Sequence, residues 1–211
     1  MKLFIFEHCP YCIKSLLVAR ALGLEVDVRF LLNDDEATPN QLVGKKIVPI
    51  LVKDDDTAMA ESLDIAEYFC TLANKELSQG EHFSQAQQWV EKHLETFLRL
   101  TFVRWPQLAL PEYAIDTAIS YFREKKEQRL GESFDSVLAN SDADIATMEH
   151  ALSELTWLQT PEHITWADVA LFPFLRNLTV VKGLTFPEHV LNYVDTLATE
   201  HRIKTFTRVA I

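Results

Sequence analysis

The chain has 211 residues, of which 48% are hydrophobic and 24% are charged, so it is long enough to bury a core and its composition does not indicate disorder. Lys and Arg total 20 against 31 Asp and Glu, which gives a formal net charge of −11, and the basic residues are scattered along the sequence. This distribution excludes a basic stripe that could neutralise phosphates, so we expect no nucleic-acid partner.

The first segments of the chain predict a strand, a helix and a second strand. "KLFIF" (2–6) reads as a short buried strand, and "PYCIKSLLVARAL" (10–22) has helical spacing, with Pro in the first turn and Gly23 at its end. "EVDVRFLL" (25–32) alternates like a strand. This order forms a βαβ unit, in which the two strands are parallel.

The next segments complete an α/β pattern. We expect a second helix at about 35–43, ending near Gly44, then strands at 47–52 and 57–60 joined across the turn "KDDD". A helix at 62–73 follows. The order βαβ-α-ββα is that of a thioredoxin-like domain.

The rest of the chain predicts helices alone. The stretch 74–84 is polar, holds a Gly and has no periodic apolar face, so it is expected to be a linker. We predict an N-terminal domain at 1–73 and an all-helical C-terminal domain at 85–211. Helical spacing without a strand-like segment recurs in five stretches: 84–100, 113–130, 134–158, 168–181 and 188–202.

A short motif marks the start of one of these helices. "TWAD" (165–168) precedes the apolar run "VALFPFL" and reads as a capping box, with Thr165 as the cap and Asp168 reaching back. We expect Asp168 to be structural and to have no part in catalysis.

No segment predicts a membrane span or a secretory signal. A membrane helix needs roughly 18 consecutive apolar residues, and no run approaches that length. The apolar start "LFIF" is stopped by Glu7 and His8 before any cleavage-like segment. We therefore expect a cytoplasmic protein without a membrane partner, in which three cysteines do not form a secreted disulfide scaffold.

Cys9 and Cys12 form a Cys-x-x-Cys pair between the first predicted strand and the helix that begins at Pro10. The first sulfur then lies at the helix N-terminus, where unpaired N–H groups and the helix dipole stabilise an anion. We expect Cys9 to be the attacking thiolate and Cys12 to resolve a mixed disulfide formed on it. Tyr11 supplies no acid or base, but it would offer a flat surface beside the sulfur.

Two other interpretations of the pair stay open. A structural zinc site needs about four ligands, and the third cysteine, Cys70, has no second Cys or His at ligand spacing, so no metal is expected. Alternatively, the pair is incidental and both thiols are simply buried. Cys70 falls on an apolar helical face and is expected in the core. His8 is expected to point to solvent, because thiol exchange at a helix end needs no separate base.

Two further stretches indicate how a ligand would be held. In "IVPI", a cis Val48-Pro49 bond would leave the Val48 backbone able to pair with an extended peptide, whereas the plain alternative is a Pro that starts an edge strand. In "AESLDIAEYF", Ser62 stands where a helix N-cap is expected, with Asp64 in the first turn. The same helix start could bind a carboxylate, and Glu61 could hold an ammonium group.

Taken together, "CPYC", "VPIL" and "ESLDIAEYF" resemble a glutaredoxin active site on a glutathione transferase framework. With "LLNDD" and the late "LFPFLRNLT", the whole chain resembles the large two-domain bacterial glutaredoxins of the glutaredoxin 2 family. The resemblance implies an α/β thioredoxin-like N-terminal domain plus an all-α C-terminal domain in a glutathione transferase-like architecture. The small one-domain glutaredoxins carry a Gly-Gly turn where this chain has "AES", which favours a transferase-like grip on glutathione.

The resemblance also implies a division of labour among the site residues. Cys9 would be the nucleophile, the Val48 backbone would contact the cysteinyl part of glutathione, and Glu61 with Ser62 would hold its γ-glutamyl end. Lys45 and Lys46 are candidates for the glycine carboxylate, although two loop lysines are also typical of a solvated surface. The residues expected to bind glutathione are Tyr11, Val48, Pro49, Glu61 and Ser62.

We therefore expect a monomeric glutathione-dependent thiol-disulfide oxidoreductase that reduces protein disulfides and glutathionylated proteins. Glutathione would be its co-substrate, with no tightly bound cofactor and no metal. One alternative is a Cys-type glutathione transferase or dehydroascorbate reductase, although such chemistry does not need Cys12. The other is a non-enzymatic binding scaffold of the same fold. A ligand cleft for the transferase alternative would be lined by aromatic side chains that are otherwise expected in the core: Trp89, Phe97, Phe102 and Trp105.

Overall fold

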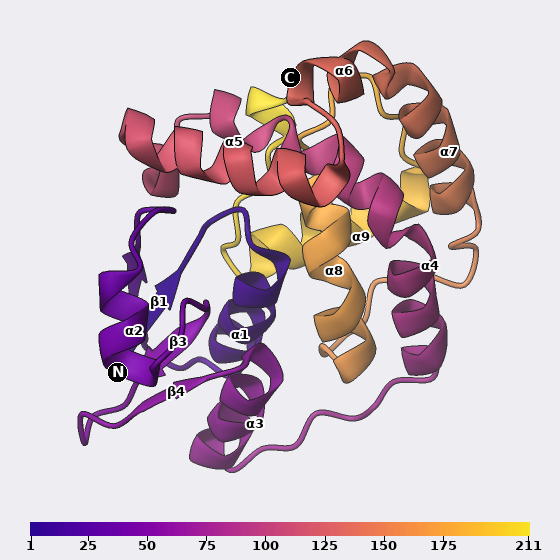
Figure 1. Ribbon diagram of the computed structural model, residues 1–211. Helices are drawn as coiled ribbons and strands as arrows, with labels where there is room; N and C mark the ends of the chain where they lie inside the picture. Colours follow the sequence, from indigo (N-terminus) through magenta and orange to yellow (C-terminus); the bar gives the residue numbers. More distant parts are fainter. The chain divides into compact units, whose positions relative to one another are not determined.

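The structure, a computed structural model, describes residues 1–211 and divides into two compact units (Figure 1). The first unit comprises residues 1–77 together with 109–122, and the second comprises 78–108 and 123–211. The segment 109–122 therefore groups with the α/β part of the chain, although it is separated from that part by more than thirty residues. None of the helices combines the length and apolarity needed to cross a membrane.

The first unit contains a four-stranded sheet in the order β2-β1-β3-β4. Strand β1 (Lys2–Ile5) is parallel to β2 (Asp27–Phe30), which confirms the predicted βαβ unit. Strand β3 (Ile50–Val52) is antiparallel to both β1 and β4 (Ala58–Ala60). The predicted strand at 47–52 is thus shorter than expected, since its first three residues lie outside the ladder.

Three helices pack against this sheet. Figure 1 shows the strands between α2 (Ala37–Val43) on one side and α1 (Pro10–Ala21) with α3 (Ser62–Ala73) on the other. Gly44 adopts a left-handed conformation, with φ 75°, and ends α2 where the sequence predicts an end. The α/β thioredoxin-like order is confirmed. Its core is formed by fully buried apolar side chains of the sheet and helices, among them Leu3, Leu17, Val18, Ile50, Leu51, Ile65 and Phe69.

The second unit is helical, as predicted. The stretch 134–158 forms two helices that meet at Asn140, and the helix α5 (Asp116–Leu130) begins in the first unit and continues into the second. The remaining helices of this unit are α4 (Phe83–Phe102), α6 (Phe134–Ala139), α7 (Ser141–Ser153), α8 (Trp166–Leu178) and α9 (Glu188–Glu200).

Helix α8 lies in the centre of the helical unit, because every residue from Asp168 to Leu178 is buried. The predicted capping box is present at its start, where the Asp168 carboxylate accepts a hydrogen bond from the Thr165 N–H at 2.8 Å. The backbone N–H groups of Trp166 and Ala167, in the first turn, donate to the carbonyls of Ser78 and Gln79. The middle of the predicted linker is therefore hydrogen-bonded to α8.

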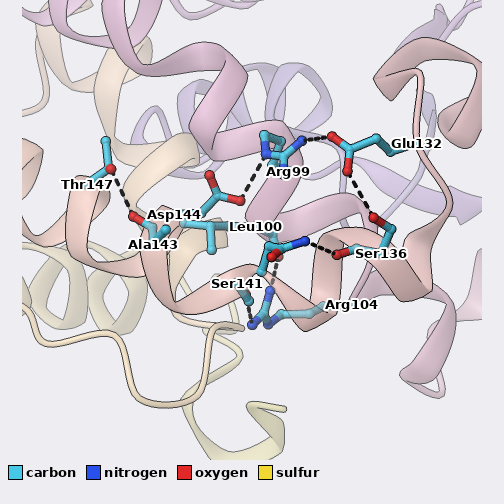
Figure 2. Close-up of polar contacts among 10 residues, drawn as sticks. Arg99, Leu100, Arg104, Glu132, Ser136, Ser141, Ala143, Asp144 and Thr147 are labelled. Carbon is cyan, nitrogen blue, oxygen red and sulfur yellow. Dashed lines mark hydrogen bonds and ion pairs between the residues drawn. The ribbon is translucent and has the colours of Figure 1, made fainter.

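Two arginines connect α4 to the helices that follow it (Figure 2). Arg99 donates to Asp144 at 2.9 Å and to Glu132 at 2.7 Å. The buried Arg104 donates to the Ser141 hydroxyl at 2.9 Å. Arg99, on α4, and Arg104, just after its end, thus bind residues in the first turns of α7 or just before α6, and they hold these helices against the C-terminal end of α4.

Candidate functional site

Cys9 lies at the position that the sequence predicts, directly before helix α1. It is the N-cap residue, with the extended backbone angles φ −76° and ψ 115°, and its sulfur accepts the backbone N–H of Cys12 at 3.4 Å. Hydrogen bonding from the Cys12 side chain, and then from backbone N–H groups of the first turn, lowers the pKa of Cys9 below its ordinary value, although burial opposes this shift. The sulfur is partly buried and is a free thiol.

Cys12 has the opposite environment. Its side chain is fully buried, and burial raises the pKa of the Cys12 thiol well above its ordinary value. As the pH rises, Cys9 therefore loses its proton before Cys12 does. The third cysteine, Cys70, is 8% exposed and lies in the core of α3, as predicted. No group of three or more His, Cys, Asp or Glu side chains is placed to hold a metal ion.

The side chains that flank the sulfur on α1 are Tyr11 and Lys14. Tyr11 is 48% exposed, so its ring is accessible on the first turn of α1. The Lys14 ammonium lies 5.2 Å from the centre of this ring. Burial lowers the pKa of Lys14, while the negative charge of Cys9 acts to raise it. The Lys14 ammonium therefore contributes a positive charge near Cys9.

His8 does not point to solvent, so that prediction is wrong. Its residue is 7% exposed, and its ring nitrogen Nδ1 lies 2.6 Å from Oε1 of Glu112. The backbone N–H of His8 donates to the same carboxylate oxygen at 2.9 Å. The physical reason is that Glu112 supplies a buried acceptor, which compensates the imidazole for the loss of water.

Aromatic rings complete the surroundings of His8. The rings of Phe6 and Tyr113 stack on it with centroid distances of 5.7 Å and 5.4 Å, and Phe122 meets it edge-on. The Tyr113 hydroxyl lies 3.3 Å from Nδ1. This apolar enclosure fixes the residue that directly precedes Cys9.

Glu112 was not predicted as a site residue. It belongs to the short 3-10 helix Pro111–Tyr113 and is completely buried. Its backbone carbonyl accepts the N–H of Asn33 at 2.9 Å, which attaches the segment to the first unit. A single Glu within the apolar stretch "LALPEYA" was the only available signal, and it does not identify a partner 104 residues away.

The sheet register brings three loop segments to one end of the sheet. Phe4 pairs with Ile50, and Ile50 pairs with Ala60. The turn after β1, the residues just before β3 and the residues just after β4 therefore emerge side by side. These segments contain Cys9, the Val48-Pro49 bond, and Glu61 with Ser62, so the topology collects the predicted glutathione-binding residues.

The Val48-Pro49 bond is cis, the first of the two alternatives that the sequence leaves open. The expected N-cap role of Ser62 is wrong by one position, because α3 begins at Ser62 and Glu61 is the N-cap residue. Glu61 has φ 70° and ψ 120°, which are not helical angles. The helix therefore starts at Ser62, one residue earlier than it would if Ser62 were the cap.

The helix starts at Cys9 and at Ser62 are linked by a buried side chain. Ser15, on α1, donates its hydroxyl hydrogen to the Ser62 carbonyl at 2.9 Å. Lys45 forms an ion pair with Glu61 at 2.9 Å. Lys46 donates to the Asn33 carbonyl at 2.7 Å, and its ammonium lies 3.6 Å from the centre of the Tyr121 ring.

The aromatic residues considered for a transferase cleft lie mostly in the helical core. Trp89, Phe97 and Trp105 are 7%, 5% and 1% exposed, and Phe102 is half-buried. The Trp89 indole N–H donates to the Ala151 carbonyl at 2.8 Å. These side chains pack α4 against its neighbours, in agreement with the core alternative.

Comparison with known proteins identifies relatives along the whole chain. Residues 3–77 match the family described as glutathione S-transferase, N-terminal domain, and residues 85–210 match the family described as glutaredoxin 2, C terminal domain. The sequence is 37% identical to glutaredoxin 2 of Escherichia coli strain K12 over 216 aligned residues, which cover 100% of both chains.

Solved structures give the same result at two levels of similarity. The crystal structure of glutaredoxin 2 from Salmonella typhimurium in complex with glutathione matches with a TM-score of 0.94 and 35% identity, covering 100% of this chain and 98% of that one. Glutathione transferase GSTFuA3 from Phanerochaete chrysosporium matches with a TM-score of 0.67 and 15% identity, covering 94% and 96%. The second match shows the fold alone.

Proposed function

Because the chain belongs to the glutaredoxin 2 family and is a glutathione-dependent oxidoreductase, we propose that its reaction is thiol-disulfide exchange at Cys9, with Cys12 as the resolving thiol. The observation that carries the proposal is the position of the Cys9 sulfur, which caps α1 and accepts a backbone N–H of its first turn. This geometry stabilises the thiolate, the form that attacks a disulfide.

With a glutathionylated protein, the Cys9 thiolate attacks the sulfur of the bound glutathione. A bond forms between Cys9 and glutathione, the protein–glutathione disulfide breaks, and the protein leaves as a thiolate that takes up a proton. The thiolate of a second glutathione then attacks the mixed disulfide. Oxidised glutathione is released, and Cys9 is regenerated.

With a protein disulfide, the mixed disulfide on Cys9 contains the substrate protein. Cys12 loses its proton and attacks the Cys9 sulfur, so that a Cys9–Cys12 disulfide forms and the substrate leaves reduced. Two glutathione molecules then reduce this disulfide and become one oxidised glutathione. The raised pKa of Cys12 keeps this thiol protonated until a mixed disulfide has formed on Cys9.

Glutathione is proposed to bind along the converging loops described above. The backbone of Val48, before Pro49, would pair with the cysteinyl part, and Tyr11 would cover the sulfur. Glu61 and the N-terminus of α3 at Ser62 would hold the ammonium and carboxylate of the γ-glutamyl end. The support is the shared end of the sheet, together with the glutathione complex of the Salmonella relative.

Lys45 adds a positioning contact to this proposal. Its ion pair with Glu61 orients the Glu61 carboxylate. Because Lys45 is engaged in this ion pair, the glycine carboxylate of glutathione has no assigned partner. The proposed partners are glutathionylated or disulfide-containing proteins, the proposed state is a monomer, and the proposed compartment is the reducing cytoplasm.

The test compares wild type with Cys9→Ser, Cys12→Ser and the matched control Cys70→Ser. Cys9→Ser is expected to lose at least about a thousandfold in turnover of a glutathione mixed disulfide, since it removes the nucleophile. Cys12→Ser is expected to retain much of this activity and to lose reduction of protein disulfides. The buried Cys70→Ser variant should behave as wild type.

The same three variants can contradict the proposal. Activity retained in Cys9→Ser would exclude Cys9 as the nucleophile. Equal losses in Cys9→Ser and Cys12→Ser on both substrates would exclude the proposed division of labour. The transferase alternative predicts a different pattern, in which Cys12→Ser has no effect on any substrate.

A further inference from the structure

The carboxylate of Glu112 is buried beside the reactive loop with a single side-chain partner. Oε1 accepts two hydrogen bonds, one from the backbone N–H of His8 and one from its ring. Oε2 is buried and has no hydrogen-bond partner. Burying a carboxylate costs several kcal/mol unless it is well paired, so an arrangement with one unpaired oxygen is not one that fold stability alone favours.

The position of His8 gives this contact its significance. His8 directly precedes Cys9, and its backbone N–H is one of the two groups that Glu112 holds. The turn from Phe6 to Cys9 is also closed by a hydrogen bond from the Cys9 N–H to the Phe6 carbonyl at 3.3 Å. Glu112 therefore fixes the middle of the turn that orients the Cys9 sulfur toward the first turn of α1.

We propose that Glu112 is a positioning residue for thiol-disulfide exchange, acting through His8 on the turn that carries Cys9. The inference rests on the proposed function of Cys9. Glu112 comes from the segment 109–122, which groups with the first unit although it lies beyond the first helix of the second. The segment thus contributes a residue to the surroundings of Cys9, in addition to the hydrogen bond with Asn33 that attaches it to the first unit.

Glu112 has two opposing effects on Cys9. Its hydrogen bonds to His8 hold the turn that carries the Cys9 thiolate, whereas its negative charge disfavours that thiolate. Its negative charge acts to raise the pKa of both Cys9 and Cys12. The other titratable groups around Cys9 are Lys14 and Tyr11 on α1, Tyr113 beside Glu112, and His8 itself. Removing the charge and removing the acceptor oxygen therefore have separable effects on Cys9.

The experiment measures the rate of Cys9 alkylation by iodoacetamide as a function of pH, and kcat/KM on a glutathione mixed disulfide. The variants are Glu112→Gln, which keeps an acceptor oxygen without the charge, and Glu112→Ala, which removes both. The matched control is Tyr121→Phe, which removes a hydrogen bond from the same segment to Glu36 at 2.8 Å.

For Glu112→Gln, the midpoint of alkylation is expected at a lower pH than in wild type, because the repelling charge is gone while His8 is still held. For Glu112→Ala, kcat/KM is expected to fall about tenfold, the size of losing one to two hydrogen bonds. Its alkylation midpoint should lie above that of Glu112→Gln, since the turn that presents Cys9 is no longer fixed. Tyr121→Phe should match wild type.

The inference is overturned if Glu112→Ala and Glu112→Gln, both folded, share one midpoint and one kcat/KM. If Glu112→Ala does not fold, Glu112→Asp replaces it, because the shorter side chain keeps the charge and withdraws the acceptor oxygen from His8. A folded Glu112→Asp variant with the wild-type midpoint and the wild-type kcat/KM overturns the inference. Failure of the proposed function is a different result, namely activity in Cys9→Ser, because the alkylation profiles report on Cys9 whether or not it is the nucleophile.

Discussion

Two buried carboxylates, one in each unit, have opposite hydrogen-bonding states. Asp168 in the helical unit is 6% exposed, and both of its oxygens have partners. Thr165 donates to Oδ2 from its backbone and its hydroxyl at 2.8 Å and 2.7 Å, and Tyr193 donates to Oδ1 at 2.8 Å. Glu112 in the α/β unit is completely buried and satisfies one oxygen only.

The difference separates a carboxylate that closes a local structural motif from the one that we propose positions Cys9. Asp168 borders a cavity of about 230 Å³, yet its partners come from its own helix start and from α9, so it closes a local motif. Glu112 uses its one satisfied oxygen on the residue before Cys9. Satisfied networks stabilise a fold, whereas an under-satisfied buried group near a nucleophile is typical of a functional site.

The largest expected effect is on the stability of the helical unit. Asp168→Ala removes the acceptor of three hydrogen bonds and should lower the free energy of unfolding by about 3 kcal/mol, measured by urea denaturation. The folded variant should keep the wild-type alkylation profile of Cys9. A loss of activity without a loss of stability would reverse the roles assigned to the two carboxylates.

Two Tyr→Phe variants, one beside each buried carboxylate, are expected to have effects of intermediate size on stability. Tyr193→Phe leaves Asp168 Oδ1 without its donor and should cost about 1 to 2 kcal/mol in urea denaturation. Tyr113→Phe removes a longer contact, 3.3 Å from His8, and should cost less than about 1 kcal/mol. Equal costs would show that the weaker contact near the redox site is as important to the fold as the stronger one.

The smallest expected effect is on the pH dependence of stability. Although burial raises the pKa of Glu112, the hydrogen bonds from His8 hold it below its ordinary value. Its contribution to stability is therefore present above the unfolded pKa of about 4.3 and is lost as the pH falls through the folded pKa. Unfolding of wild type followed from pH 6 to pH 3 should lose this contribution, and Glu112→Gln should give a flatter curve over the same range.

The parts of the site that the sequence predicted are those encoded by neighbouring residues. The Cys9 position follows from a strand, a Cys-x-x-Cys pair and a Pro in the first helical turn, all within twelve residues. The Thr165 capping box was predicted for the same reason, since its two partners are three residues apart.

The parts that were missed depend on long-range contacts or on single backbone angles. His8 was expected to point to solvent because thiol exchange needs no separate base there, and its acceptor lies 104 residues away, where the local sequence gives no sign of it. The start of α3 was displaced by one residue because the positive φ of Glu61 outweighs the capping preference of Ser62. Neither property has a signature in local composition.

The grouping of 109–122 with the α/β unit has a consequence for truncation. A fragment ending at residue 77 would carry Cys9, Cys12 and the whole sheet, yet it would expose the imidazole of His8 and remove its acceptor. A minimal redox module from this chain would therefore require the 3-10 segment around Glu112 to be grafted back, for instance as a tethered peptide.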